Sequence, residues 1–158
     1  MALAAILRNA RAAMPPVTIS YSSDNGSVPP PHRRSLSAAL DADGALRVER
    51  TRGYGDADRE IEVSTAAPDV VAALVEDLRR LGLFTTAWSE PDRRVVGGSA
   101  RRVEVRVGDD HAVIPSAVVA EQREARDAIV ACVQKALGLR SRPQPGVPLA
   151  EGKSDPGA

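Results

Sequence analysis

The 158-residue sequence contains a single cysteine, Cys132, and very few aromatic residues. One cysteine excludes a disulfide within the chain and a zinc cluster built from several cysteines. Aromatic residues make up 3% of the chain, so we expect a core built from Val, Leu, Ile and Ala. The formal net charge is zero, so the chain lacks an overall field that would attract nucleic acid or an anionic membrane.

The sequence also lacks a long apolar run and the pattern of a secretory signal. A membrane-spanning helix needs roughly 20 apolar residues, and no stretch approaches that length. The apolar start MALAAIL is followed by Arg8 and Arg11, whereas a secretory signal places its basic residues before the apolar stretch. We therefore predict a cytoplasmic protein, and both Met1 and Met14 remain candidate translation starts.

Patterns of catalytic and metal sites are absent as well. The chain has no GxSxG, HExxH, CxxC or phosphate-loop motif. His32 and His111 lie in separate expected turns, without the spacing of a zinc site. The sequence therefore predicts a protein that is not an enzyme and binds no cofactor or metal. The alternative is an enzyme in which carboxylates from separate turns converge in space, namely Asp56, Asp58, Asp109 and Asp110.

Short segments with period-two alternation predict five to six strands. The clearest of these cover residues 17–21, 36–40, 46–48, 59–64 and 102–107, and a last one ends at Ile114. Asp43 and Gly44 suit the tight turn of a hairpin. Within 59–64, we expect Ile61 and Val63 to face the core.

Two segments show helical periodicity. The first lies between Pro68 and Gly82, and the second covers about 119–137. The apolar stripe of the first comprises Val71, Leu74, Val75, Leu78 and Leu81. That of the second comprises Ala125, Ile129, Cys132, Val133 and Leu137.

This order of elements predicts an α+β fold, with a single antiparallel sheet of about five to six strands and two helices on one face. We expect one domain over residues 16–138. Residues 1–15 are expected to form a flexible N-terminal tail. Residues 139–158, rich in Pro, Gly and charge, are expected to form a disordered C-terminal tail.

The connector after the first helix carries the candidate binding residues. Phe84 closely follows the Gly82 cap and is expected to pack in the core. Trp88 lies in a polar loop that no apolar stripe explains, which makes it the candidate contact residue. Adjacent arginines flank the same loop and are expected to form a basic patch: Arg93, Arg94, Arg101 and Arg102. The expected partner is another protein, with no nucleic acid or membrane, and the oligomeric state is left open.

Three motifs in the second half of the chain are the helix end LGLFTT, the strand and turn VEVRVGDD, and the IP before the last helix. In these motifs, residues 70–137 resemble the emfourin family of small proteins that inhibit thermolysin-type metalloproteases. The resemblance implies a non-catalytic protein-binding module and a metalloprotease as the candidate partner, and no inhibitory residue is transferred. The alternative functions are a structural or assembly role and the carboxylate-based enzyme.

Overall fold

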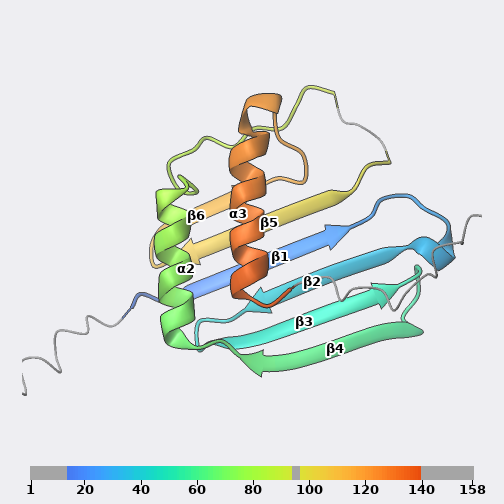
Figure 1. Cartoon of the computed structure of the whole chain (residues 1–158), viewed down its shortest axis with the longest axis horizontal. Helices are drawn as coiled ribbons and strands as arrows, with labels where there is room; N and C mark the ends of the chain where they lie inside the picture. The colour runs from blue at the N-terminus through green and yellow to red at the C-terminus, as the bar shows by residue number, and fades with distance from the viewer. Residues whose placement is uncertain (1–13, 94–96, 140–158) are drawn as a thin grey trace, which may run out of the picture.

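The computed structural model describes residues 14–93 and 97–139. Six strands form one antiparallel sheet in the order β4-β3-β2-β1-β5-β6 (Figure 1). The strands are β1 (Val17–Asp24), β2 (Arg34–Leu40), β3 (Ala45–Arg52), β4 (Asp58–Thr65), β5 (Ala100–Val107) and β6 (Asp110–Ile114). The helices are α2 (Pro68–Arg80) and α3 (Arg123–Ala136), and the short 3-10 turns are η1 (Pro30–His32) and η2 (Ala120–Gln122). The predicted α+β fold is confirmed.

The centre of the sheet joins two parts of the chain. Strands β1 to β4 form a meander in which each strand pairs with the next. Helix α2 then returns the chain, so that β5 pairs with β1 on its other side, from Val17↔Val107 to Asp24↔Ala100. A short turn leads from β5 into β6, as antiparallel neighbours allow. Both helices lie on the same face of this sheet (Figure 1).

The core lies between the helices and the alternating apolar side chains of β1, β2, β3, β5 and β6. Tyr21 is the largest of the fully buried side chains in the described part of the chain. Its hydroxyl accepts a hydrogen bond from Nε2 of Gln134 at 2.8 Å, so the one polar atom it brings into the core has a partner. The prediction of an aliphatic core is confirmed.

Both helices end in the same hydrogen-bonded motif, at a glycine with positive φ. Gly82 has φ 79°, and the N–H of Leu83 donates to the carbonyl of Leu78 at 3.0 Å. This is the Schellman arrangement, in which the residue after the glycine packs back on the last turn. Leu83 is completely buried, whereas Leu81 is 37% exposed and Phe84 is half-buried. The prediction that Leu81 and Phe84 lie in the core is therefore wrong for Leu81 and only partly right for Phe84.

Helix α3 repeats this ending one residue beyond the expected domain boundary. The N–H of Leu139 donates to the carbonyl of Gln134 at 2.8 Å, and Leu139 is buried in the core. The packed domain therefore includes Leu139. The rest of the predicted C-terminal tail, and the predicted N-terminal tail up to residue 13, lie outside the described residues.

The expectation that Ile61 and Val63 face the core is wrong. In β4, Glu62 pairs with Val48 and Ser64 with Leu46, and these partners on β3 are buried. The even-numbered residues of β4 therefore share the helix-covered face, while Ile61 and Val63 lie on the opposite face. No helix within residues 14–93 and 97–139 covers that face (Figure 1), and we call it the open face. The alternation correctly predicts a strand, but the side predicted to face the core is the opposite of the one observed.

Candidate functional site

Trp88, the predicted contact residue, is half-buried and packs against the core. Its indole N–H donates to the carbonyl of Leu83 at 3.0 Å, and its backbone N–H donates to the carbonyl of Thr86 at 3.1 Å. The indole therefore folds back over the end of α2. Its main observed contacts are structural, and only part of its surface is left for a partner.

The predicted arginine patch is divided by the strand that carries half of it. Arg93 is exposed in the loop, and Arg94 lies outside the described residues. Arg101 and Arg102 are both exposed in β5, where successive side chains point to opposite faces. Arg102 lies on the open face, and Arg101 shares the face of the buried Val103. These two arginines therefore cannot act as one patch.

The four turn carboxylates of the enzyme alternative lie at opposite ends of the sheet. Asp56 and Asp58 follow the end of β3, next to the end of β1 that holds Asp24. Asp109 and Asp110 follow the end of β5, beside the start of β1 at Val17. The expected convergence of these carboxylates is therefore wrong. Among the described residues, no group of three or more His, Cys, Asp and Glu side chains could hold a metal ion.

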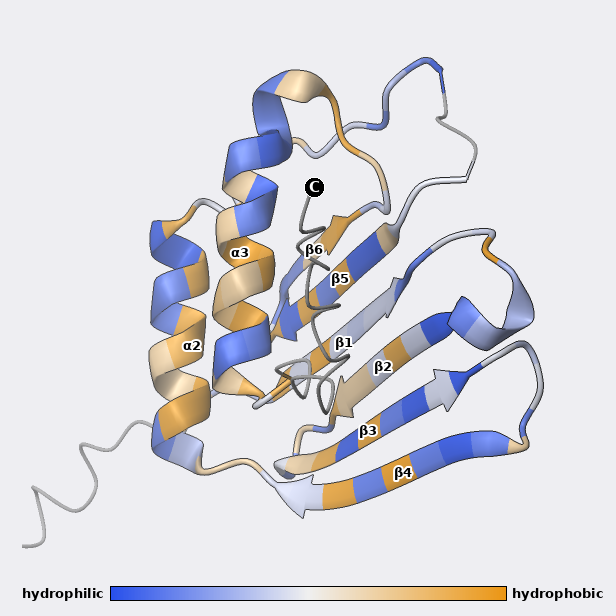
Figure 2. Cartoon of the chain, turned by 45° about the vertical axis from the view of Figure 1, so that its right-hand side comes forward, coloured by the Kyte–Doolittle hydropathy of each residue, from blue (hydrophilic) through white to orange (hydrophobic). Residues whose placement is uncertain are grey.

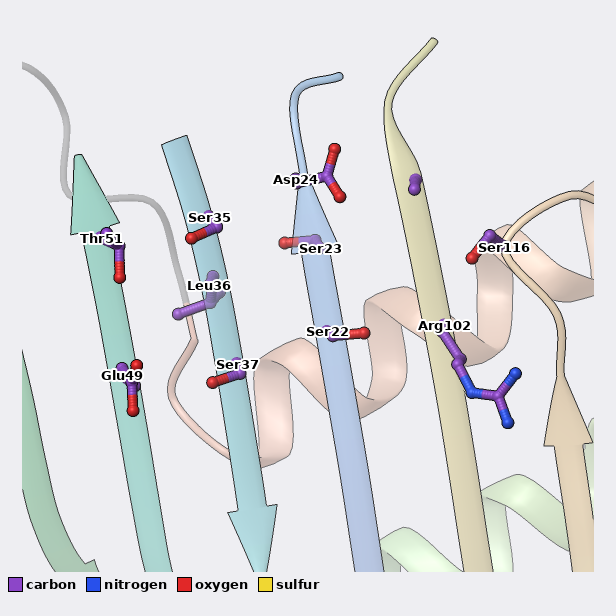
Figure 3. A pocket seen from close by; sticks show the side chains of 11 residues that line it. Ser22, Ser23, Asp24, Ser35, Leu36, Ser37, Glu49, Thr51, Arg102 and Ser116 are labelled. Carbon is purple, nitrogen blue, oxygen red and sulfur yellow. The ribbon is translucent and has the colours of Figure 1, made fainter. Parts of the chain in front are cut away.

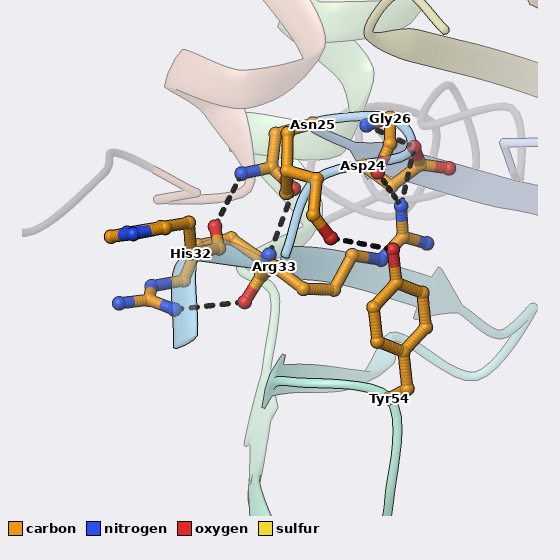
Figure 4. A network of polar contacts seen from close by, with 8 residues as sticks. Asp24, Asn25, Gly26, His32, Arg33 and Tyr54 are labelled. Carbon is orange, nitrogen blue, oxygen red and sulfur yellow. Dashed lines mark hydrogen bonds and ion pairs between the residues drawn. The ribbon is translucent and has the colours of Figure 1, made fainter. Parts of the chain in front are cut away.

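The end of the sheet that carries Asp24 holds a network of polar contacts around an exposed aromatic residue (Figure 4). Tyr54, between β3 and β4, is 62% exposed. Its hydroxyl donates to the carbonyl of Val28 at 2.7 Å, and the guanidinium of Arg33 lies 5.2 Å from the centre of its ring. This cation–π contact and the hydrogen bond hold an exposed aromatic ring in one place.

Arg33 is itself fixed by the end of β1. Its Nη1 lies 3.1 Å from Oδ1 of Asp24 and 2.6 Å from the carbonyl of Gly26. The same Asp24 oxygen accepts the N–H of Gly26 at 2.8 Å. Asn25 adds two bonds, donating to the carbonyl of His32 and accepting the N–H of Arg34 (Figure 4). The connection between β1 and β2 is therefore ordered by its own side chains.

This connection also touches the loop before β5. Gly26 has φ 83°, and a Cβ built on it would lie 2.8 Å from the carbonyl oxygens of both Gly97 and Gly98. Only glycine fits such an approach. The connections 25–33, 53–57 and 97–99 thus meet at one end of the sheet, and we call this region the loop end.

Tyr54 was not among the residues singled out from the sequence. The surrounding stretch RGYGDAD has the composition of a turn, because glycine and aspartate favour turns. A tyrosine within such a turn is a signal that could have marked it, since an aromatic side chain in a loop has no strand neighbours to cover it. The restraint by Arg33 and Val28 comes from 21 and 26 residues away, which no local pattern could show.

The open face carries a shallow polar depression of ≈ 190 Å³ next to the loop end (Figure 3). Small hydroxyl side chains from β1 and β2 form its floor, and Glu49 and Arg102 stand at its two sides. The lining residues on the central strands are Ser22, Ser23, Asp24, Ser35, Leu36 and Ser37. The depression is wide and holds no buried unpaired side-chain polar atom among the described residues, so it offers weak anchoring for a small molecule.

Hydrogen-bonded ionisable side chains flank the depression on β3 and on β5. On β3, Glu49 receives Nε and Nη2 of Arg59, each at 2.8 Å, and these hydrogen bonds lower the pKa of the Glu49 carboxyl. On β5, Glu104 lies 2.9 Å from Nε2 of His111, and this hydrogen bond lowers the pKa of the Glu104 carboxyl. All four side chains are solvent-accessible, which is typical of a solvated sheet face.

A mainly apolar groove of ≈ 340 Å³ runs between the two helices, with Leu81, Ala128 and Cys132 in its lining. Cys132, which the sequence places on the apolar stripe of α3, is half-buried. Burial and the nearby carboxylate of Asp77, 3.9 Å from its Sγ, raise the pKa of the thiol. The thiol therefore stays protonated at neutral pH, which is the opposite of what a nucleophile needs.

None of the helices in the described part of the chain is long and apolar enough to cross a membrane. Comparison of the chain with models of known protein families and with curated protein sequences finds no match.

Proposed function

We propose that this chain is a small, non-catalytic protein-binding module of the cytoplasm, and that the loop end is its contact surface. The observation that supports this most directly is the restraint of Tyr54, an exposed aromatic side chain held by Arg33 and by the carbonyl of Val28. Tyrosine is enriched among the residues that dominate protein interfaces. A ring that is already ordered loses little further conformational entropy on binding.

The loop end has the arrangement that binding loops on a rigid sheet usually have. The six-stranded sheet and its two helices provide the scaffold, and three connections meet at one end of it. Arg33 and Asp24 are both partly exposed beneath Tyr54, so a partner would meet an aromatic ring bordered by one positive and one negative group. Trp88 and Arg93 lie in the adjoining connector and are proposed as peripheral contacts.

The partner class follows from the resemblance of residues 70–137 to the emfourin family, and it is a proposal of the same kind. We propose that the partner is a thermolysin-type metalloprotease and that binding inhibits it. In such a complex the chain would contribute no catalytic group, and the loop end would cover the access to the substrate-binding cleft.

The test is inhibition of a purified thermolysin-type metalloprotease, measured by the hydrolysis of a small peptide substrate at increasing concentrations of the chain. We expect inhibition by the wild type and at least about tenfold weaker inhibition by Tyr54→Ala, since truncating an interface anchor costs about 2 kcal/mol or more and about 1.4 kcal/mol corresponds to a factor of ten. Arg80→Ala is the matched control, because Arg80 is exposed on α2, away from the loop end.

Two results would contradict the proposal in different ways. Absence of any inhibition by the wild type would remove the metalloprotease as partner and leave the binding role. Affinity capture with mass spectrometry would then compare the wild type with Tyr54→Ala. Equal recovery of the same specific partner by both proteins would remove the loop end as the contact surface.

A further inference from the structure

The outer edge of β4 is the longest unpaired backbone edge in the described part of the chain. All eight residues of the strand are exposed, and β4 is the last strand of the sheet on its side. No described helix or strand lies along its outer side (Figure 1). The other edge strand, β6, is five residues long. An open edge of this kind can pair with another strand.

The hydrogen-bond register shows which residues of β4 direct their backbone groups outward. The N–H of Ala66 donates to the carbonyl of Gly44 at 2.9 Å, so this pair belongs to the bonded set of the β3–β4 ladder. Bonded and non-bonded pairs alternate in an antiparallel ladder, so Glu62 and Ser64 bond to β3. The residues that alternate with this bonded set direct their backbone N–H and C=O groups to solvent: Arg59, Ile61, Val63 and Thr65.

Two of these outward-bonding residues also expose β-branched side chains. Ile61 is 45% exposed and Val63 is 68% exposed, and both side chains lie on the open face. Figure 2 shows apolar positions alternating with hydrophilic ones along β4. On the other face of the same strand, Glu60 and Glu62 are exposed as well. The strand thus presents one apolar row, one acidic row and a free backbone ladder.

We propose that β4 is a self-association site, and that it pairs antiparallel with β4 of a second copy of this chain. Ile61 then lies opposite Val63 of the second copy, and the two sheets join into one continuous sheet. The arrangement is closed by a two-fold axis, because each copy offers the other the same surface.

The register with Ile61 opposite Val63 is proposed because the two copies of β4 complement each other in it. With Ile61 opposite Val63, the outward-bonding residues of both copies face each other, so each such pair exchanges two backbone hydrogen bonds. The pair of Ile61 and Val63 occurs twice, which gives apolar β-branched contacts on the open face. On the other face, Glu60 lies opposite Ser64 of the second copy, which brings no like charges together.

One like-charge pair remains, and the monomer already compensates it. Glu62 lies on the two-fold axis opposite Glu62 of the second copy. In each copy, Nη1 of Arg50 lies 3.3 Å from Oε2 of Glu62. Each of the two carboxylates is therefore already paired with an arginine of its own copy. The register with Ile61 opposite itself would instead place Glu60 against Glu62 twice, which like-charge repulsion disfavours.

The dimer is expected to be reversible. One strand pair buries less surface than the roughly 1,200–2,000 Å² of a standard protein interface. The first experiment is therefore sedimentation velocity of the full chain over a wide concentration range. We expect the weight-average mass to rise from that of a monomer and to level off at twice that value. A constant monomer mass at all concentrations would overturn the proposal, and so would growth beyond a dimer.

A proline at an outward-bonding position tests the edge itself. Val63→Pro removes an N–H that has no partner within β4 and β3, so the monomer should keep its fold, as proline is tolerated on the open side of edge strands. The dimer should be lost at concentrations where the wild type dimerises. Val63→Thr, which keeps the N–H and the β-branched shape, is the matched control and should still dimerise. A folded Val63→Pro variant that dimerises like the wild type would overturn the proposal.

Disulfide trapping tests the register. In a Cys132→Ser background, Glu62→Cys places two thiols opposite each other across the two-fold axis, in a non-bonded pair where the Cβ atoms are closest. Mild oxidation should then give a covalent dimer. Glu60→Cys is the control, because its counterpart in the second copy lies four residues along the strand. Faster dimer formation by Glu60→Cys than by Glu62→Cys would overturn this register.

Discussion

The indole N–H of Trp88 donates a hydrogen bond to the backbone carbonyl of Leu83, 3.0 Å away. This bond joins the connector after α2 to the fully buried residue that closes the helix. The sequence predicts Phe84 as the core residue of this segment and Trp88 as its surface contact residue, and the structure differs on both. Leu83 is part of the core at the helix end, whereas Trp88 and Phe84 are partly buried and pack against the core.

The first prediction concerns the anchor of the helix end. Leu83→Ala should lower the free energy of unfolding by about 2–5 kcal/mol, since a completely buried leucine leaves a cavity when truncated. Phe84→Ala should cost clearly less, because Phe84 is only half-buried. Urea denaturation of both variants measures the difference. A Phe84→Ala loss equal to or larger than that of Leu83→Ala would contradict this assignment.

The second prediction isolates the hydrogen bond of Trp88. Trp88→Phe keeps an aromatic ring over the helix end but removes the indole N–H, so the free energy of unfolding should fall by about 1 kcal/mol. Trp88→Ala should cost more, because it also removes the packing of the ring against the core. Chemical denaturation of both variants checks this order. Equal stability of Trp88→Ala and the wild type would mean that the ring contributes no packing.

The third prediction concerns the contact between Gly26 and the glycines before β5. Gly26→Ala should destabilise the fold by more than about 1 kcal/mol, since its φ of 83° and the carbonyl oxygens 2.8 Å from a Cβ both disfavour a side chain. Gly55→Ala is the matched control, because a Cβ at Gly55 meets nothing within 4 Å and its φ is not positive. Thermal unfolding followed by circular dichroism should separate the two variants. Similar melting temperatures would contradict the close approach.

The fourth prediction concerns pH. Hydrogen bonds from Arg59 hold the pKa of Glu49 below its ordinary value of 4.5. A carboxyl whose pKa is lower in the folded state stabilises the fold above its unfolded pKa. That contribution is lost as the pH falls through the folded pKa. The wild type should therefore have a higher urea midpoint than Glu49→Gln at neutral pH, by a small margin because both partners are accessible to solvent.

The same comparison at acidic pH provides its own control. The difference in urea midpoint between the wild type and Glu49→Gln should shrink once the pH is below 4.5 and vanish when Glu49 is fully protonated. A difference that stays constant down to strongly acidic pH would show that the substitution acts through packing and not through the charge of Glu49.

The sequence by itself determined the order of the elements and the class of the fold. Alternation over 17–21 and 36–40, and the helical stripe from Val71 to Leu78, are local patterns that report which backbone geometry buries their apolar residues. Gly82 likewise marked the end of α2, since a positive φ at a helix end favours glycine whatever lies around it. These signals depend only on neighbours along the chain, and the structure agrees with them.

Only the tertiary structure decided which side of each element is covered. Alternation in β4 is the same whether Ile61 or Glu62 faces the helices, and the choice follows from the pairing of Glu62 with Val48. The separation of Arg101 from Arg102 depends on β5 beginning at Ala100. The contacts that hold Tyr54 in place, with Arg33 and with the carbonyl of Val28, join residues that the sheet brings together from different connections. Such contacts arise from chain folding over long separations, so no local period records them.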